Sequence, residues 1–202
     1  MNLQALISQG EHQQQDFKYA ITSISKIAHS LSAFANTDGG RLLVGVRDNG
    51  KIAGVKSEEE IYMIDAAAQQ CIPPVDCNMQ VVREEGHQVL IVSIPPCNDR
   101  PVCAREDDGQ YRAYIRQADE NIVASPIHLE MWHQLYRRNN LTFTNSDNLL
   151  LQLFPPEGLT LNQFTRHSRL TRIKAIRLLA GWTRLGLLQL RYQEPRWLLV
   201  PC

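Results

Sequence analysis

The sequence predicts an α+β protein in two parts: a mixed domain of strands and helices, followed by a winged helix-turn-helix. Three observations lead to this prediction. Apolar residues make up 44% and charged residues 21% of the 202-residue chain, which is typical of folded globular proteins. Over the longer first part, segments whose apolar residues have the spacing of a strand alternate with segments whose apolar residues have the spacing of a helix. Three short helical segments and a hairpin pattern close the chain, in the order of a winged helix.

Elements of the first part follow from apolar spacing and turn residues. Asn36-Thr37-Asp38-Gly39-Gly40 should end a helix, because glycine adopts the positive φ of a helix C-cap. Asn49-Gly50 is a strong hairpin signal, and Ser125-Pro126 is a typical helix start. We expect helices over residues 2–9, 23–35, 58–70 and 125–138, and strands over 13–17, 41–46, 51–55, 79–83, 88–94 and 109–116.

The second part begins after a polar stretch without periodicity. We therefore place the first domain at residues 1–139, a linker at 140–146 and the winged helix at 147–202. Ser146 or Asp147 is the expected cap of its first helix. The expected elements are helices over 149–154, 161–167 and 171–185, and strands over 187–192 and 196–200.

Charge is distributed unequally along the chain. The net charge is zero, yet residues 160–202 hold eight basic residues and one acidic residue, Glu194. The rest of the chain holds the other 13 of 21 basic and 20 of 21 acidic residues. A solvated helix face usually mixes both signs, so this segment is predicted to bind a polyanion such as nucleic acid.

The third helix of the second part has an apolar face that includes Leu179 and Trp182. Lys174, Arg177, Gly181 and Arg184 fall on the opposite face, where cations can neutralise phosphates. Winged helices also serve as protein-contact modules, and that alternative stays open. The residues predicted to bind nucleic acid are Arg116, Arg169, Arg172, Lys174, Arg177, Arg184 and Arg196.

Targeting and cysteine patterns favour an intracellular, cytoplasmic protein. The N-terminus lacks the basic start and apolar core of a secretory signal, and no apolar run is long enough for a membrane helix. Five cysteines occur without a CxxC pair, so reduced thiols are expected, and zinc is the lesser alternative.

Several motifs of the first part occur in a characteristic order. Glu11 precedes Asp16-Phe17-Lys18, which is followed by Ala33-Phe34-Ala35-Asn36-Thr37-Asp38-Gly39-Gly40 and then by Gly45-Val46-Arg47-Asp48. This series resembles the Schlafen-type AlbA-like domain over roughly residues 1–138. The resemblance implies a mixed sheet with flanking helices and the handling of nucleic acid. Bacterial relatives often carry a trailing winged helix, which implies a DNA-binding transcriptional regulator.

The resemblance also implies an alternative activity. Schlafen relatives that cut RNA use three carboxylates in a metal-dependent site, and the matching positions are Glu11, Asp16 and Asp48. The second position is Asp here where those nucleases have Glu. Mg²⁺ or Mn²⁺ would be the metal, and Lys18 and Arg116 would hold phosphate. From residue type alone, a structural interpretation is favoured: Glu11 is solvated, Asp16 binds a backbone group, and Asp48 is a turn residue.

Three functions therefore stay open: a DNA-binding regulator, an endoribonuclease of the Schlafen type, and a protein-interaction adaptor. The target would be DNA or structured RNA. No G-x-x-x-x-G-K-[ST] segment occurs, so a P-loop ATP site is not expected. Eukaryotic relatives pair two such lobes in one chain, and the resemblance therefore implies a homodimer here.

Overall fold

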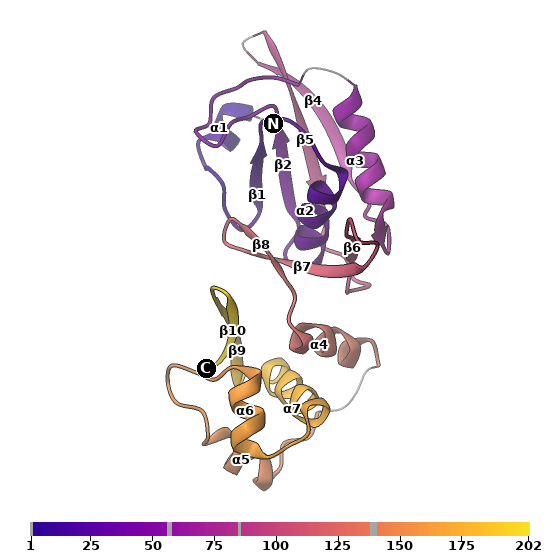
Figure 1. Cartoon of the computed structure of the whole chain (residues 1–202). Helices are drawn as coiled ribbons and strands as arrows, with labels where there is room; N and C mark the ends of the chain where they lie inside the picture. Colours follow the sequence, from indigo (N-terminus) through magenta and orange to yellow (C-terminus); the bar gives the residue numbers. More distant parts are fainter. Residues whose placement is uncertain (1, 56–57, 85, 138–140) are drawn as a thin grey trace. The chain divides into compact units, whose positions relative to one another are not determined.

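The protein is described by a computed structural model covering residues 2–55, 58–84, 86–137 and 141–202. Its contacts divide the chain into two compact units, residues 1–123 and 124–202 (Figure 1). Helices and strands occur in both, which confirms the predicted α+β class.

A four-stranded mixed sheet forms one layer of the first unit, in the order β1-β2-β5-β4. The β1–β2 pair is parallel, and the other two pairs are antiparallel. Alternate residues face opposite sides, so Leu42 and Val92 belong to one core cluster while Leu43 and Ile91 belong to another. The strands are β1 (Gln15–Lys18), β2 (Gly40–Val44), β4 (Asn78–Glu84) and β5 (His87–Ile94).

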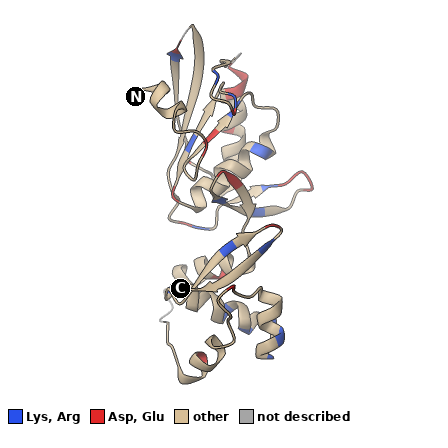
Figure 2. Ribbon diagram, turned by 90° about the vertical axis from the view of Figure 1, so that its left-hand side faces the viewer, with Lys and Arg blue, Asp and Glu red and all other residues tan. Residues whose placement is uncertain are grey.

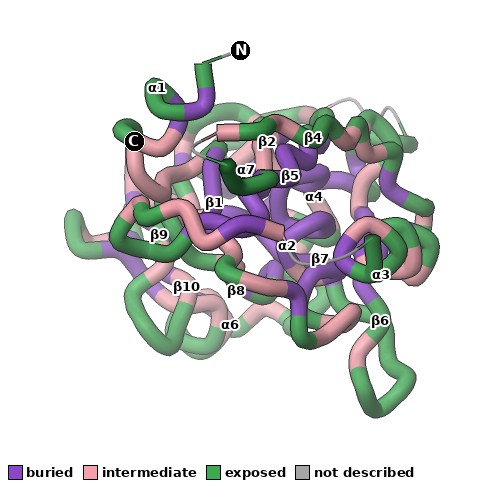
Figure 3. The backbone as a smooth tube through the Cα atoms, turned by 90° about the horizontal axis from the view of Figure 1, so that it is seen from above, coloured by how far each residue is buried: buried purple, intermediate pink, exposed green. Residues whose placement is uncertain are grey.

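A second sheet, in the order β3-β6-β7-β8, is antiparallel. Helix α2 (Ile24–Asn36) packs in the core between the two sheets, and Leu31 and Phe34 are fully buried there (Figure 3). The strands are β3 (Cys71–Ile72), β6 (Cys103–Arg105), β7 (Tyr111–Gln117) and β8 (Glu120–Val123); α1 (Leu3–Ile7) and α3 (Glu59–Gln69) complete the unit. β3, β6 and β8 were not predicted, because two to four residues are too few to show a period.

The ends of α2 confirm the sequence signals. The Ser23 side chain caps its first turn by accepting a hydrogen bond from the Lys26 N–H. Gly39 follows the helix with φ +70°, and its N–H donates to the Phe34 carbonyl. A Cβ at Gly39 would lie 2.7 Å from the Ile94 carbonyl oxygen, so the turn brings β2 tightly against β5.

The expected return strand at residues 51–55 is wrong. The turn at Asn49-Gly50 forms, but only an isolated bridge joins Val46 to Ile52. The N–H groups of Ala53 and Gly54 both donate to the Gly45 carbonyl, and the Val55 N–H donates to Gln88. Backbone donors that a hairpin ladder would need are therefore used elsewhere.

The second unit contains four helices among its described residues, followed by a two-stranded hairpin. An isolated bridge between Leu159 and Leu199 ties the segment before α6 to the hairpin. Phe164, Leu179 and Trp182 form the centre of its core. The elements are α4 (Pro126–Tyr136), α5 (Asn145–Leu151), α6 (Leu161–Ser168), α7 (Arg172–Arg184), β9 (Leu188–Gln193) and β10 (Arg196–Pro201).

Helix α4 belongs to the second unit, whereas the sequence placed it in the first domain. Its Ile127 is buried in the core that contains Leu179, and its Gln134 donates to the Arg177 carbonyl of α7. The units thus divide earlier than the expected boundary at residues 139–140, which lies outside the described residues. Thr144, from the expected linker, caps α5 in place of Ser146 or Asp147.

His128 makes the second unit sensitive to acid. Its Nδ1 accepts from the N–H of Ser125 at the start of α4, and its ring contacts Trp197 edge-on at 4.6 Å. Burial lowers the pKa of His128 to about 4. A depressed histidine pKa means that the neutral form contributes stability above the unfolded pKa of about 6.5, and that this contribution is lost as the pH falls through about 4.

We therefore expect the second unit to lose about 2–3 kcal/mol of unfolding free energy between pH 7 and pH 4 through His128 alone. All three tryptophans (Trp132, Trp182 and Trp197) lie in this unit, so tryptophan fluorescence during urea unfolding reports it selectively. His128→Gln, which keeps an acceptor for the Ser125 N–H, should lose stability less steeply in acid. An equally steep loss in the variant would contradict this role of His128.

Candidate functional site

The carboxylate of Asp16 lies inside the first unit, next to two cations. β1 carries both Asp16, which is 3% exposed, and Lys18. The Lys18 Nζ lies 2.6 Å from Asp16 Oδ2, an ion-pair distance without the angles of a hydrogen bond. Arg116 Nη2, from β7, lies 3.4 Å from Asp16 Oδ1. The charge of Asp16 is thus balanced by side chains of the protein itself.

Arg116 is one of the largest fully buried side chains of the chain, with 2% exposure. Its Nη1 donates to the Asn121 side chain, and its Nη2 donates to the carbonyls of His12 and Gln15. The guanidinium also lies over the Phe34 ring, 5.0 Å from the centroid. This burial disagrees with the predicted contact between Arg116 and nucleic acid, because the guanidinium is buried and bound to groups of the protein itself.

Glu11 lies next to Asp16, and its carboxylate is hydrogen-bonded to the backbone. Its Oε1 accepts a hydrogen bond from the N–H of Phe17 at 2.9 Å. Partial burial, followed by the hydrogen bond and charge of Asp16, raises the pKa of Glu11, while the Phe17 N–H and Lys18 act in the opposite sense. Glu11, Asp16 and Lys18 therefore lie close together in the structure.

Asp48, by contrast, is an exposed residue of the turn between Val46 and Ile52. Within the described ranges, no group of three His, Cys, Asp or Glu side chains is placed to hold a metal ion. Asp16 is already neutralised by two cations, and Glu11 binds a backbone N–H. The expected Mg²⁺ or Mn²⁺ set of Glu11, Asp16 and Asp48 consequently does not fit a metal in this arrangement, and we derive no metal-dependent step.

Asn36, the asparagine of the Ala-Phe-Ala-Asn-Thr motif, is a buried connector between α2 and the second sheet. Its Nδ2 donates to the carbonyls of Val102 and Tyr114, and its Oδ1 accepts from the Val102 N–H at 2.8 Å. Ser32, one turn earlier, donates to the same Val102 carbonyl and accepts from the Tyr114 N–H. The motif asparagine thus fixes the second sheet to the helix through partners that are far away in the chain.

One polar cluster was missed by the sequence reasoning. His29 Nε2 lies 3.2 Å from Glu106 Oε1 and 3.5 Å from Ser25 Oγ, and Glu106 also accepts from the Tyr114 hydroxyl. A catalytic Ser–His–acid triad needs the serine and the acid on different ring nitrogens. Here both face Nε2, so the cluster is a structural network, and no motif in the sequence marks it.

Exposed cations of the second unit lie on α6, on the first half of α7 and on the β9–β10 hairpin, and Figure 2 shows basic residues on both helices and strands of this unit. Arg172, the first residue of α7, is exposed, and so are Lys174 and Arg177, which lie on the side opposite the buried residues Ala175, Leu179 and Trp182. Arg169 is exposed and ends α6 in the left-handed conformation, with φ 57°. Arg166, Arg191 and Arg196 are further exposed cations of this unit.

The predicted cationic stripe is shorter than expected, because α4 covers the second half of α7. Gly181 is buried, and Arg184 Nη1 donates to the Gln134 side chain of α4 at 3.3 Å. Arg172 retains an exposed side chain, although its Nη1 donates to Asn162 at 2.7 Å. We define the basic face as Arg166, Arg169, Arg172, Lys174 and Arg177.

Comparisons with known proteins agree with the boundary of the first unit. The model of the family described as Schlafen, AlbA_2 matches residues 11–125. No curated protein matches the chain. A crystal structure of the DIP2311 protein from Corynebacterium diphtheriae is similar over 93% of this chain, at 17% identity and a TM-score of 0.48. The match spans 34% of that protein, about a third of its length.

Across the described part of the chain, no helix combines the length and the apolar character needed to cross a bilayer.

Proposed function

Because the chain belongs to the Schlafen, AlbA_2 family, we propose that it binds nucleic acid, and that its second unit is a winged helix-turn-helix serving a DNA-binding regulator. The order α5, α6, α7 and the β9–β10 hairpin supports this fold. The Leu159–Leu199 bridge supports it further, because it joins the segment between the first two of these helices to the hairpin.

The observation that carries the proposal is the asymmetry of α7. One side of the helix is apolar and buried, and its first half presents Arg172, Lys174 and Arg177 to solvent. In the helix-turn-helix arrangement, the first residues of the second helix of the motif reach the base edges of the major groove. The major groove of B-DNA is wide enough for a helix, whereas that of A-form RNA is too narrow, which favours duplex DNA as the target.

The other two functions receive less support. A nuclease would need a carboxylate set for its metal, and the arrangement of Glu11, Asp16 and Asp48 does not fit one. A protein adaptor would not require a face with five cations, although an acidic partner would match it. The homodimer implied by the resemblance stays a prediction, to be checked by the mass in solution.

A charge-neutralised variant tests the proposal. Lys174→Gln with Arg177→Gln removes two exposed cations from the basic face and leaves the buried side of α7 intact. We expect binding to a 30-base-pair duplex at low salt to weaken about tenfold or more, because each phosphate contact contributes through counterion release. Fluorescence anisotropy of a labelled duplex measures this affinity.

The matched control removes the same charge from the first unit. Lys51→Gln with Arg83→Gln changes two exposed positions there and should leave the affinity within about twofold, since neither residue belongs to the basic face. An unchanged affinity in Lys174→Gln with Arg177→Gln would refute binding through the basic face. Equal weakening in both would indicate attraction by overall charge, which also contradicts the proposal.

A further inference from the structure

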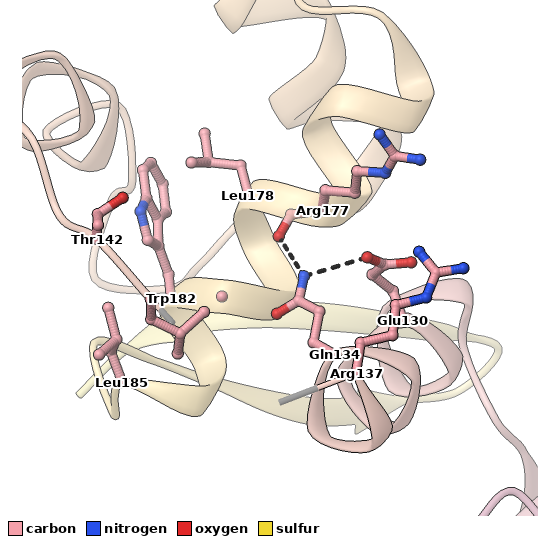
Figure 4. Close-up of a pocket in the computed structure, with 10 residues that line it drawn as sticks. Glu130, Gln134, Arg137, Thr142, Arg177, Leu178, Trp182 and Leu185 are labelled. Carbon is pink, nitrogen blue, oxygen red and sulfur yellow. Dashed lines mark hydrogen bonds between the residues drawn. The ribbon is translucent and has the colours of Figure 1, made fainter. Parts of the chain in front are cut away.

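A cavity of about 330 Å³ lies within the second unit, between α4 and α7 (Figure 4). Its volume falls at the lower end of the range of small-molecule sites. Leu178, Trp182 and Leu185 line one part of it, and Glu130, Gln134 and Arg137 line another. Apolar walls with a few grouped polar side chains are typical of ligand sites.

The polar part of the cavity is held rigid by Gln134. Its Nε2 donates to the Arg177 carbonyl at 2.9 Å and to Glu130 Oε1 at 3.2 Å, and its Oε1 accepts from Arg184. Figure 4 shows the two Gln134 donor contacts as dashed lines. Gln134 is itself 6% exposed, so α4 and α7 are fixed to each other by a buried amide.

Trp182 provides an unused donor. The indole is 1% exposed, and its Nε1 has no hydrogen-bond partner among the described residues. Buried indole N–H groups are nearly always hydrogen-bonded in native proteins. Figure 4 shows this ring beside Thr142, on the wall opposite Glu130 and Arg137. Because Nε1 is itself buried, a ligand in the cavity would contact the apolar ring of Trp182 and not this N–H.

Gly181 keeps the wall of α7 open. A Cβ at this position would meet only the Leu141 side chain at 3.5 Å and Gln134 Oε1 at 4.0 Å. Glycine inside a helix is unfavourable compared with alanine, and its conformational freedom is not needed at a helical φ. The absence of a side chain therefore preserves space at the centre of the cavity.

The charges around the cavity favour an anion. Arg137 and Arg177 are exposed at its rim, and no ion pair is found for either within the described ranges. Glu130 is the one carboxylate among the described lining residues, so the two arginines leave the lining with a net positive charge. We propose that this cavity binds a small organic acid with an apolar ring: the ring lies against Leu178, Trp182 and Leu185, and the acid group pairs with Arg137 and Arg177.

This site would affect nucleic-acid binding through Arg177, which belongs both to the cavity rim and to the basic face. A bound acid group would compete with phosphate for its guanidinium, so the ligand should weaken the binding of duplex. This consequence rests on the proposed function, whereas the binding of the acid does not. The two can therefore fail separately.

The test uses the full chain, labelled with ¹⁵N, and three probes. Phenylacetate has both the ring and the charge, phenylacetamide has the ring without the charge, and acetate has the charge without the ring. We expect phenylacetate to shift the Trp182 indole N–H resonance in a saturable way, with at least tenfold weaker binding of the other two. Trp182→Phe assigns the resonance among the three indole signals.

Two variants complete the experiment. Gly181→Leu fills the cavity and should abolish the shift, while Arg137→Gln leaves its walls in place and should reduce phenylacetate affinity several-fold without changing the response to phenylacetamide. The dispersion of the amide spectrum shows that each variant is folded. Absence of a saturable Trp182 shift with phenylacetate, or equal binding of the acid and the amide, would overturn the proposal.

Discussion

Replacing Arg116 with alanine is expected to destabilise the first unit by about 3–5 kcal/mol, the range for removing one partner of a buried ion pair. The guanidinium lies 3.4 Å from the buried carboxylate of Asp16 and donates to the Gln15 and His12 carbonyls. Its loss leaves these acceptors without a donor and opens a cavity beneath Phe34. Lys18 would remain the one described cation beside Asp16.

Urea unfolding separates this effect from changes in the second unit. Because the tryptophans all lie in residues 124–202, far-UV circular dichroism reports both units while tryptophan fluorescence reports the second. Arg116→Ala should shift the dichroism transition and leave the fluorescence transition in place. Arg112→Ala, an exposed position on the same strand, is the control and should change stability by about 0.5 kcal/mol or less. Equal transitions for the two variants would contradict a stabilising role of Arg116.

The second large effect is expected at Asn36. Asn36→Ala removes the donors to the Val102 and Tyr114 carbonyls and the acceptor for the Val102 N–H, all of them buried. A buried polar group left unsatisfied costs about 1–3 kcal/mol, so we expect a loss of about 3–5 kcal/mol in the first unit. Val102 and Tyr114 belong to the region of the second sheet, which would separate from α2 in the variant.

The same dichroism measurement tests this prediction, with hydrogen exchange as a local readout. Amide protection should fall most at Val102 and Tyr114, whose N–H groups are bonded to Asn36 and Ser32. Asn98→Ala changes an exposed asparagine and should be nearly neutral. Unchanged exchange at Val102 in the Asn36 variant would show that the motif asparagine does not hold the sheet.

Local signals in the sequence predicted the elements well where a chemical marker stands at their ends. Ser125 caps the helix that it was expected to cap, and Gly39 ends α2 with a positive φ. Short strands such as β3 carried no such marker, because two residues cannot show a period. The Asn49-Gly50 turn forms without its return strand, because the N–H groups of residues 53–55 donate to Gly45 and Gln88 and do not extend the hairpin.

Long-range partners account for what the sequence could not predict at the candidate site. Asp16 and Arg116 are a hundred residues apart, and only the packing of β1 near β7 makes a buried pair of two residues that were expected to bind metal and phosphate. The helical period of α7 placed Gly181 and Arg184 correctly beside Arg177, but it does not say that α4 covers that part of the helix. The cavity arises from the same packing and has no motif.

The salt dependence of duplex binding tests the central claim most directly. The observed association constant falls with salt by about 0.9 logarithmic units per phosphate neutralised. We predict that the slope for Lys174→Gln with Arg177→Gln is shallower than that of the unchanged chain by about 1.8, while Lys51→Gln with Arg83→Gln keeps the original slope. A slope that is the same in all three proteins would contradict nucleic-acid binding through the basic face of the second unit.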